Sequence, residues 1–254
     1  MVGSGITDTH AHLADSLFDG DRAEVVRRAQ TAGVTEIIGM STTIEDAQKN
    51  LRLAQEFSLL KPAAGLYPGY PDLDQAEAMA TFIRSNRSRL AAIGEVGLDY
   101  WLAKEDRERE LQLQIFNIFV DLALELDLPL NVHSRSAGRH IISFLLQKGA
   151  ARVQLHAFDG KASSAQPAVE AGFFFSIPPS LVRSRQKQKL VRRLPVSCLL
   201  VESDSPVLGP TPEARNEPGN IPDKISFTHC SQGYCRVERN LARRADRGIG
   251  GKHP

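Results

Sequence analysis

Cysteine, long apolar runs and an excess of charge of one sign are all lacking in this 254-residue chain. Its three cysteines, Cys198, Cys230 and Cys235, are too few and too clustered to form a disulfide framework. No stretch approaches the roughly 18 uninterrupted apolar residues of a membrane-spanning helix, and no basic-then-apolar leader precedes Gly3. These absences predict an intracellular protein, cytoplasmic or nuclear, with free thiols and no membrane association.

Positive and negative side chains are nearly balanced, with 31 Lys and Arg against 30 Asp and Glu and a formal net charge of +1. This balance does not suggest a protein that coats nucleic acid through bulk electrostatics, so any nucleic-acid contact must be local. An apolar content of 42% differs from the composition of disordered chains and suffices for a sizeable core. The length is typical of one α/β barrel, so we predict a single domain.

Short apolar runs alternate with longer helical patterns, which is typical of repeated β–α units around a parallel sheet. We predict eight strands, at residues 5–9, 36–40, 63–67, 90–94, 130–132, 152–155, 172–176 and 197–201. We predict helices at residues 21–32, 44–57, 74–86, 105–127, 141–147, 163–170 and 180–193. Eight strands with intervening helices favour a TIM-like (β/α)8 barrel over an open doubly wound sheet.

Histidines and carboxylates recur where the predicted strands end. His10 and His12 end the first strand, and their spacing of two places both side chains on one face. The other four such residues are Glu95, His133, His156 and Asp204. A single histidine or carboxylate at the end of a strand is more often a structural hydrogen-bonding or helix-capping group than a metal ligand. The placement of all six at strand ends, however, favours a metal site. The carboxyl ends of barrel strands converge on the face that carries the active site, so we expect these six side chains to meet.

The predicted ligand set contains imidazole and carboxylate groups but no thiolate, which suits divalent Zn, Mn, Mg or Co. Six ligands exceed the three protein ligands and one water that a catalytic zinc requires. Two metals about 3.5–4 Å apart, bridged by a carboxylate, fit the set better. We expect Glu95 to be the bridge and Asp204 to be the general base that deprotonates an attacking water.

Six short motifs carry a resemblance to a known family. They are residues 8–13 (DTHAHL), 94–99 (GEVGLD), 128–135 (LPLNVHSR), 156–160 (HAFDG), 202–206 (ESDSP) and 215–218 (RNEP). In order and spacing they are similar to those of the TatD deoxyribonucleases, and the resemblance covers residues 5–222. Residues 173–180 (FFFSIPPS) and 186–191 (QKQKLV) resemble an animal branch of that family.

This resemblance implies a metal-dependent hydrolase that cuts phosphodiester bonds in DNA, typically as a 3′-to-5′ exonuclease. It implies that the six strand-end residues are metal ligands and that Arg135, close to His133, approaches the substrate phosphate. Together with the near-neutral charge it predicts action on single-stranded or frayed DNA ends, and no obligate protein partner is expected. Two other hypotheses stay open: a related barrel hydrolase of amides, lactones or small phosphoesters, and an inactive variant.

Two features depart from the family pattern. Tyr67 stands where the family commonly has the histidine of a Gly-x-His-Pro motif, and tyrosine can donate to a phosphate or stack on a base but is not an equivalent ligand. After Pro222 the chain stays polar, where the family continues into an amphipathic helix that closes the barrel. We therefore assign residues 1–222 to the barrel and 223–254 to a divergent, poorly ordered tail, with the final helix atypical or missing.

Two further groups of residues have weaker functional claims. The last predicted helix carries the basic residues Arg183, Arg185, Lys187, Lys189, Arg192 and Arg193, which we assign to the solvated outer face of the barrel. Trp101 follows Glu95 in a loop, where it could stack on an unpaired base or pack beneath the loop.

Overall fold

The computed structural model describes residues 5–221 and the backbone of two further residue pairs, 227–228 and 236–237. Those pairs form the short antiparallel strands β9 (Phe227–Thr228) and β10 (Arg236–Val237). The predicted tail over residues 223–254, with its expected lack of a closing helix, otherwise lies outside the described residues. Among the described helices, none combines the length and apolar character needed to cross a membrane.

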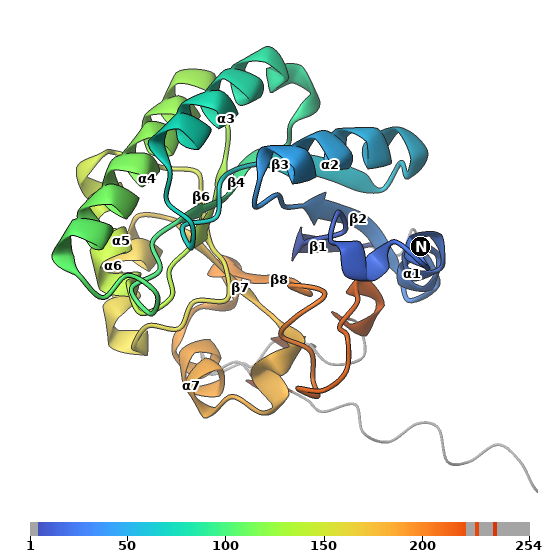
Figure 1. Cartoon of the computed structure of the whole chain (residues 1–254). Helices are drawn as coiled ribbons and strands as arrows, with labels where there is room; N and C mark the ends of the chain where they lie inside the picture. Colours follow the sequence, from blue (N-terminus) through green and yellow to red (C-terminus); the bar gives the residue numbers. More distant parts are fainter. Residues whose placement is uncertain (1–4, 222–226, 229–235, 238–254) are drawn as a thin grey trace, which may run out of the picture.

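Eight parallel strands form the centre of the fold and are hydrogen-bonded in sequence order, each to the next. They are β1 (Ile6–Ala11), β2 (Val34–Gly39), β3 (Leu60–Ala64), β4 (Ala92–Gly97), β5 (Leu130–His133), β6 (Val153–Leu155), β7 (Phe174–Ile177) and β8 (Leu199–Val201). The helices lie outside the strands (Figure 1). This arrangement confirms the predicted barrel, because a doubly wound sheet has a point at which the strand order reverses.

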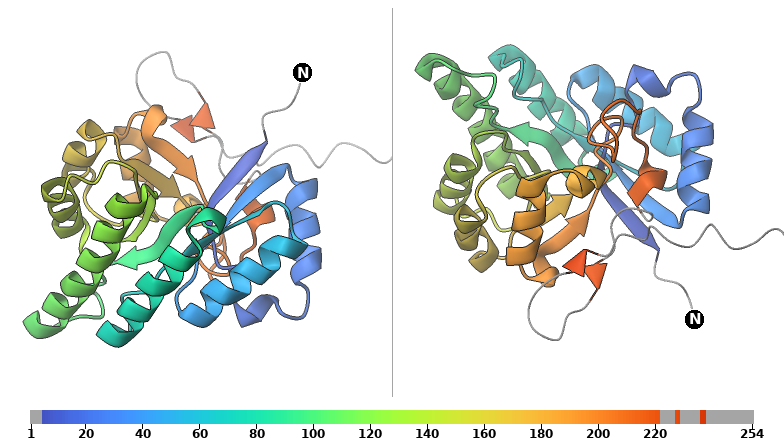
Figure 2. Two further views of the ribbon diagram at one scale, coloured as in Figure 1. Left: turned by 90° about the horizontal axis from the view of Figure 1, so that it is seen from above. Right: turned by 90° about the horizontal axis from the view of Figure 1, so that it is seen from below.

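Seven α-helices connect the strands of the described region. They are α1 (Arg22–Thr31), α2 (Ile44–Glu56), α3 (Leu73–Ser85), α4 (Asp106–Leu126), α5 (Gly138–Gln147), α6 (Gln166–Glu170) and α7 (Arg185–Arg193). Figure 2 shows α2, α3 and α4, blue to green, side by side along one side of the molecule, and contacts join each of them to the next. Their buried faces and the strands enclose the main apolar core.

Helix α4 illustrates how the sequence determines these elements. Glu105 and Glu108 form a reciprocal capping box at its start, and Asp127 takes a left-handed φ of 49° just beyond its end. The apolar stripe of this helix packs against the core through Leu111, Ile115, Ile118, Leu122 and Leu126. Because α4 contacts β4, this packing also supports the strand that carries Glu95.

Several predicted element boundaries are wrong; β3, for example, spans Leu60–Ala64 rather than residues 63–67, and α5 begins at Gly138 rather than at residue 141. Strand β4 extends to Gly97, so Glu95 lies within the strand rather than after it. Helices α6 and α7 are shorter than predicted because the 3-10 turns η3 (Ala162–Ser164) and η4 (Pro179–Val182) precede them. Ser184 then begins α7, since its side chain accepts a hydrogen bond from the backbone N–H of Lys187.

In the described part of the chain, the end of β1 is joined to the loop after β8 by individual hydrogen bonds rather than by a strand ladder. The backbone N–H of Asp204 donates to the carbonyl of His10 at 2.8 Å, and that of His12 donates to the carbonyl of Ser205 at 2.8 Å. These contacts lie beyond the last residue of β8, so they hold the loop of Asp204 directly against the end of β1.

The segment that follows β8 is tied back onto the barrel by the RNEP motif. Arg215 forms an ion pair with Asp21, with 2.6 Å between Nη2 and Oδ2. The buried Asn216 donates to the carbonyl of Ser203 at 2.6 Å. This motif therefore has a structural role, because it fixes the loop that carries Asp204.

Candidate metal centre

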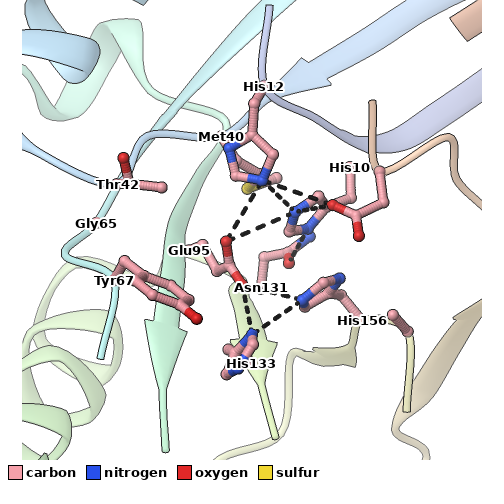
Figure 3. A network of polar contacts seen from close by, with 12 residues as sticks. His10, His12, Met40, Thr42, Gly65, Tyr67, Glu95, Asn131, His133 and His156 are labelled. Carbon is pink, nitrogen blue, oxygen red and sulfur yellow. Dashed lines mark hydrogen bonds and ion pairs between the residues drawn. The ribbon is translucent and has the colours of Figure 1, made fainter. Parts of the chain in front are cut away.

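The structure brings the six strand-end residues together at the carboxyl ends of the strands. His10 lies in β1 and Glu95 in β4, while His133 is the last residue of β5. His12, His156 and Asp204 follow β1, β6 and β8. Figure 3 shows the side chains of the four histidines and Glu95 turned toward one another. Five different strands thus contribute to one cluster.

One half of this cluster is formed by His10, His12 and Asp204. The Nε2 atoms of the two imidazoles are 3.0 Å apart. Asp204 Oδ1 lies 3.4 Å from Nε2 of His10 and 3.6 Å from Nε2 of His12. Two imidazole nitrogens and one carboxylate oxygen therefore face a common point.

The other half is formed by His133 and His156, whose Nδ1 and Nε2 atoms respectively lie 3.3 Å apart. Glu95 Oε1 is 2.7 Å from Nδ1 of His133 and 3.0 Å from Nε2 of His156. The second carboxylate oxygen, Oε2, lies 3.4 Å from Nε2 of His12 and 3.8 Å from that of His10. Glu95 consequently stands between the two halves, with one oxygen directed to each.

The donor atoms of this cluster fit divalent metal ions. His10, His12 and Glu95 form one group, and Glu95, His133 and His156 form another, each with its donor atoms within 4.8 Å of one another. Imidazole and carboxylate donors suit borderline and hard divalent cations. A third group consists of His10, His156 and Glu202, but the two oxygens of Glu202 already accept from Ser176 and from a backbone N–H.

Burial and neighbouring charges set the protonation of these groups. Burial opposes ionisation of Glu95, but the adjacent charge of His156 and the hydrogen bond from His133 hold its carboxyl pKa well below the usual range. Burial lowers the pKa of His10 to about 3, and the charge of His156 acts in the same direction. Glu95 is therefore ionised and His10 is neutral, as metal ligation requires. Although burial opposes it, the charge of Glu95 raises the pKa of His156 well above its usual value, so a cation that binds this imidazole must displace a proton.

Three polar residues that the sequence analysis did not single out lie beside ring nitrogens of the histidines. Nδ1 of His10 lies 2.8 Å from Asn131 Oδ1, and Nε2 of His133 lies 3.1 Å from Asp99 Oδ2. Glu202 Oε2 is 3.7 Å from Nδ1 of His156, which is too far for a hydrogen bond, and this buried nitrogen has no hydrogen-bond partner among the described residues. Hydrogen-bonding partners such as Asn131 and Asp99 fix the ring orientation and the tautomer of metal-binding histidines. All three lie inside the motifs quoted above, and membership of a motif was the feature of the sequence that could have identified them.

Tyr67 is directed at this orienting group rather than at the cluster itself. Its hydroxyl donates to Asp99 Oδ2 at 3.1 Å, and its ring packs edge-on against that of His133 with 5.2 Å between centroids. Burial and the charge of Asp99 raise the pKa of the Tyr67 hydroxyl, so it stays protonated and remains a donor. Tyr67 thus supports Asp99, which in turn orients His133.

A cavity of about 850 Å³ opens over the cluster. Its wall includes His12, Glu95, His133, His156 and Asp204, together with Arg135 and Lys187. The Arg135 guanidinium lies over the Trp101 ring, 5.0 Å from its centroid. Trp101 is 55% exposed, so of its two possible roles, packing beneath the loop is not observed.

The assignment of the basic run to a solvated outer face is wrong for Lys187 and confirmed for the other five residues. Lys187 is only 8% exposed and lines the cavity, whereas Arg183, Arg185, Lys189, Arg192 and Arg193 are exposed. Lys187 shares the buried face of α7 with Leu190 and Val191, three and four residues further on. Helical periodicity within the run would have identified it.

The substitution Asp99→Asn is expected to weaken metal binding or activity by about 10- to 100-fold, because it removes the charge that orients His133 and raises its basicity. The asparagine oxygen can still accept from the backbone N–H groups of Trp101 and Leu102, so the melting temperature should change little. Asp106→Asn, at an exposed side chain on α4, is the matched control. Calorimetric metal titrations of both variants that match the wild type would contradict this role of Asp99.

Comparisons with known proteins identify the family to which this chain is similar. Residues 7–229 match the sequence profile of the family described as TatD related DNase. The human protein named Deoxyribonuclease TATDN3 is 42% identical over 243 residues, which cover 91% of this chain and 88% of that protein. A Bacillus subtilis (strain 168) protein named Uncharacterized metal-dependent hydrolase YabD is 30% identical over 222 residues, covering 84% of this chain and 86% of that protein.

Solved structures show the same architecture. The crystal structure of YJJV, a TatD homologue from Escherichia coli K12, matches with a TM-score of 0.77 and 27% identity, covering 84% of this chain and 85% of that one. A TatD family hydrolase from Entamoeba histolytica also gives a TM-score of 0.77, at 20% identity, and covers 86% of this chain and 88% of that one. The barrel is thus shared even where the sequences have diverged.

Proposed function

Because this chain belongs to the TatD-related DNase family of metal-dependent hydrolases, we propose that it is a deoxyribonuclease whose site holds two divalent cations. One observation carries the proposal: Glu95 directs Oε1 to His133 and His156 and Oε2 to His12 and His10. A carboxylate shared in this way is the usual bridge of a two-metal site. Zn, Mg, Mn and Co are the candidate ions for this donor set.

The side chains divide into two sets of ligands around Glu95. His10 and His12 would hold one cation, and His133 and His156 the other. Asp204 approaches only the first pair, with Oδ1 3.4 Å from His10 Nε2. Its carboxylate is placed to orient an attacking water at that side and to accept its proton.

Bound cations would supply Lewis acidity toward the phosphate and would lower the pKa of the attacking water. Arg135 lies in the cavity wall, next to the strand that ends in His133. A guanidinium can donate two parallel hydrogen bonds to a phosphate and keeps its charge at any physiological pH. Arg135 would therefore hold the substrate phosphate beside the cluster.

We further propose that the substrate is a 3′ end of single-stranded or frayed DNA. A net charge of +1 gives little support for wrapping a duplex. The cavity of about 850 Å³ has the size of a small-ligand site, which suits a strand end better than an intact double helix. The half-exposed Trp101 beside Arg135 offers a surface on which an unpaired base could stack.

A single-stranded oligonucleotide labelled at its 5′ end is expected to shorten one nucleotide at a time when incubated with the protein and Mg²⁺ or Mn²⁺. A closed circular single strand should remain intact because it has no 3′ end. Products resolved by length over time test both statements. Internal cuts in the circle would show that the protein is an endonuclease.

The remaining hypotheses are separated by additional substrates in the same experiment. RNA oligonucleotides, bis(4-nitrophenyl) phosphate and a simple lactone represent the other hydrolase classes. Lys61, on β3, donates to the carbonyl of Ser58 at 3.1 Å, so it does not bridge the cluster as a lysine does in some barrel amidases. Hydrolysis of only the small esters would contradict a nuclease, and no hydrolysis by a folded, metal-loaded protein would indicate the inactive variant.

A further inference from the structure

Lys187 is a buried cation in the wall of the cavity, and it has no counter-ion among the described residues. It lies in the first turn of α7, is 8% exposed and reaches the cavity that contains Asp204 and His156. Its Nζ donates one hydrogen bond, to the carbonyl of Ala157 at 2.8 Å. Among the described residues, no carboxylate lies within ion-pair distance of this ammonium group. An ammonium can donate three hydrogen bonds, so two remain available.

The other cations of the cavity wall differ from Lys187. Lys49 is paired with Asp19, with 2.7 Å between Nζ and Oδ1. The guanidinium of Arg135 is stacked on Trp101. Burying an unpaired charge is costly, and buried charges are therefore normally paired. The exception at Lys187 suggests that its partner is a ligand.

The carboxylates near Lys187 interact with other groups. Glu202 accepts from Ser176 and from the backbone N–H of Ala157. Asp204 belongs to the metal cluster, where a bound cation would neutralise its charge. Asp159 accepts from the backbone N–H of Ser136. With cations in place, the positive charge of Lys187 is left facing the cavity.

We propose that Lys187 binds a nonbridging oxygen of a phosphate group in the cavity, as a second fixed cation beside Arg135. The inference rests on the proposed function in so far as that phosphate belongs to a DNA strand. The two cations come from different elements, since Arg135 follows β5 and Lys187 lies on α7. A phosphate above the cluster would then be contacted from two sides.

A purely structural role for Lys187 is the competing explanation. Its hydrogen bond to Ala157 joins α7 to the loop that follows His156, where Ala157 has a left-handed φ of 43°. Gln186, however, already joins the same two segments, because its Nε2 donates to the carbonyl of Gly160 at 2.8 Å. A neutral donor therefore suffices for this connection, and the charge of Lys187 remains to be explained.

The variant Lys187→Gln separates the two roles, because glutamine can donate to the Ala157 carbonyl but carries no charge. Inorganic phosphate is titrated calorimetrically into the Mg²⁺-loaded protein. We expect phosphate to bind at least about 10-fold more weakly to Lys187→Gln than to the wild type, as is typical for losing a hydrogen bond to a charged group. Lys187→Arg should retain most of the affinity. Lys189→Gln, two residues further along α7 and exposed, should bind phosphate like the wild type.

Unchanged phosphate affinity in Lys187→Gln would overturn the proposal. Equal losses in Lys187→Gln and Lys187→Arg, accompanied by lower melting temperatures, would also overturn it, because they would indicate packing. A second measurement follows the salt dependence of oligonucleotide binding by fluorescence anisotropy, where the slope of log affinity against log salt should fall by about one in Lys187→Gln. If the wild type does not hydrolyse DNA but phosphate affinity still depends on Lys187, the proposed function fails and the anion site stands.

Discussion

Replacing Glu95 by glutamine is expected to lower kcat/KM for DNA hydrolysis by at least about a thousandfold, which corresponds to roughly 4 kcal/mol of transition-state stabilisation. The two carboxylate oxygens of Glu95 lie between different pairs of histidines, 2.7 Å from His133 Nδ1 and 3.4 Å from His12 Nε2. Glutamine has nearly the same shape as glutamate, but an NH2 group replaces one of the two carboxylate oxygens, and this group cannot bind a cation. One of the two halves must therefore lose its ligand.

The exposed Glu77 on α3 provides the control for this substitution, since Glu77→Gln alters the same functional group at a residue that does not line the cavity. Metal content, measured by mass spectrometry, and the melting temperature should be recorded for both variants. Glu95→Gln should bind less metal while remaining folded, because its neighbours in β4 are packed in the apolar core. Near-normal turnover in Glu95→Gln would show that Glu95 is not a shared ligand.

Removing the divalent cations is expected to abolish hydrolysis, again by at least about a thousandfold, because the pKa of an unactivated water is about 15.7. The six imidazole and carboxylate side chains of the cluster have neighbouring donor atoms 2.7–3.8 Å apart. Without the cations, these side chains would lose the positive charge of the metal that binds them to one another. The melting temperature should fall as well, since a ligand that binds only the folded state stabilises it. Dialysis against EDTA, followed by activity and melting measurements, tests both effects.

Adding back single metals to the dialysed protein should restore activity and identify which of Zn, Mg, Mn and Co is effective. A restored melting temperature should accompany restored activity, because both depend on the same donor atoms. Full hydrolysis in a sample shown to contain no metal would contradict the metal-dependent mechanism. Activity that returns without any change in melting temperature would indicate that the cation enters with the substrate rather than at the cluster.

The barrel could be predicted from sequence because its strands are short apolar runs separated by helical patterns of a different period. The predicted fourth strand ended too early for a physical reason. Glu95 and Gly97 interrupt the apolar pattern, yet both are buried within β4. A charged residue inside a buried strand is explained only by the cluster it faces, and the hydrophobic pattern does not contain that information.

The six strand-end residues were within reach of sequence analysis because strand direction alone brings them to one face. Their polar partners could be found only as members of the family motifs, since the contacts themselves depend on which strands lie opposite. Asn131 in β5 reaches His10 in β1, and Asp99 after β4 reaches His133. Lys187 lies among exposed basic residues, and only helical periodicity, which places it on one face with Leu190 and Val191, distinguishes its buried position. Composition cannot distinguish one inward lysine from its outward neighbours.

The most direct test of this account is a titration of the metal-free protein with Mn²⁺ while cleavage of a 5′-labelled single-stranded oligonucleotide is followed. A site in which Glu95 is shared by two cations predicts that the rate rises until two equivalents of Mn²⁺ per chain are bound and then levels off. A plateau at one equivalent would contradict the two-metal site. Cleavage that does not depend on added Mn²⁺ would contradict the account as a whole.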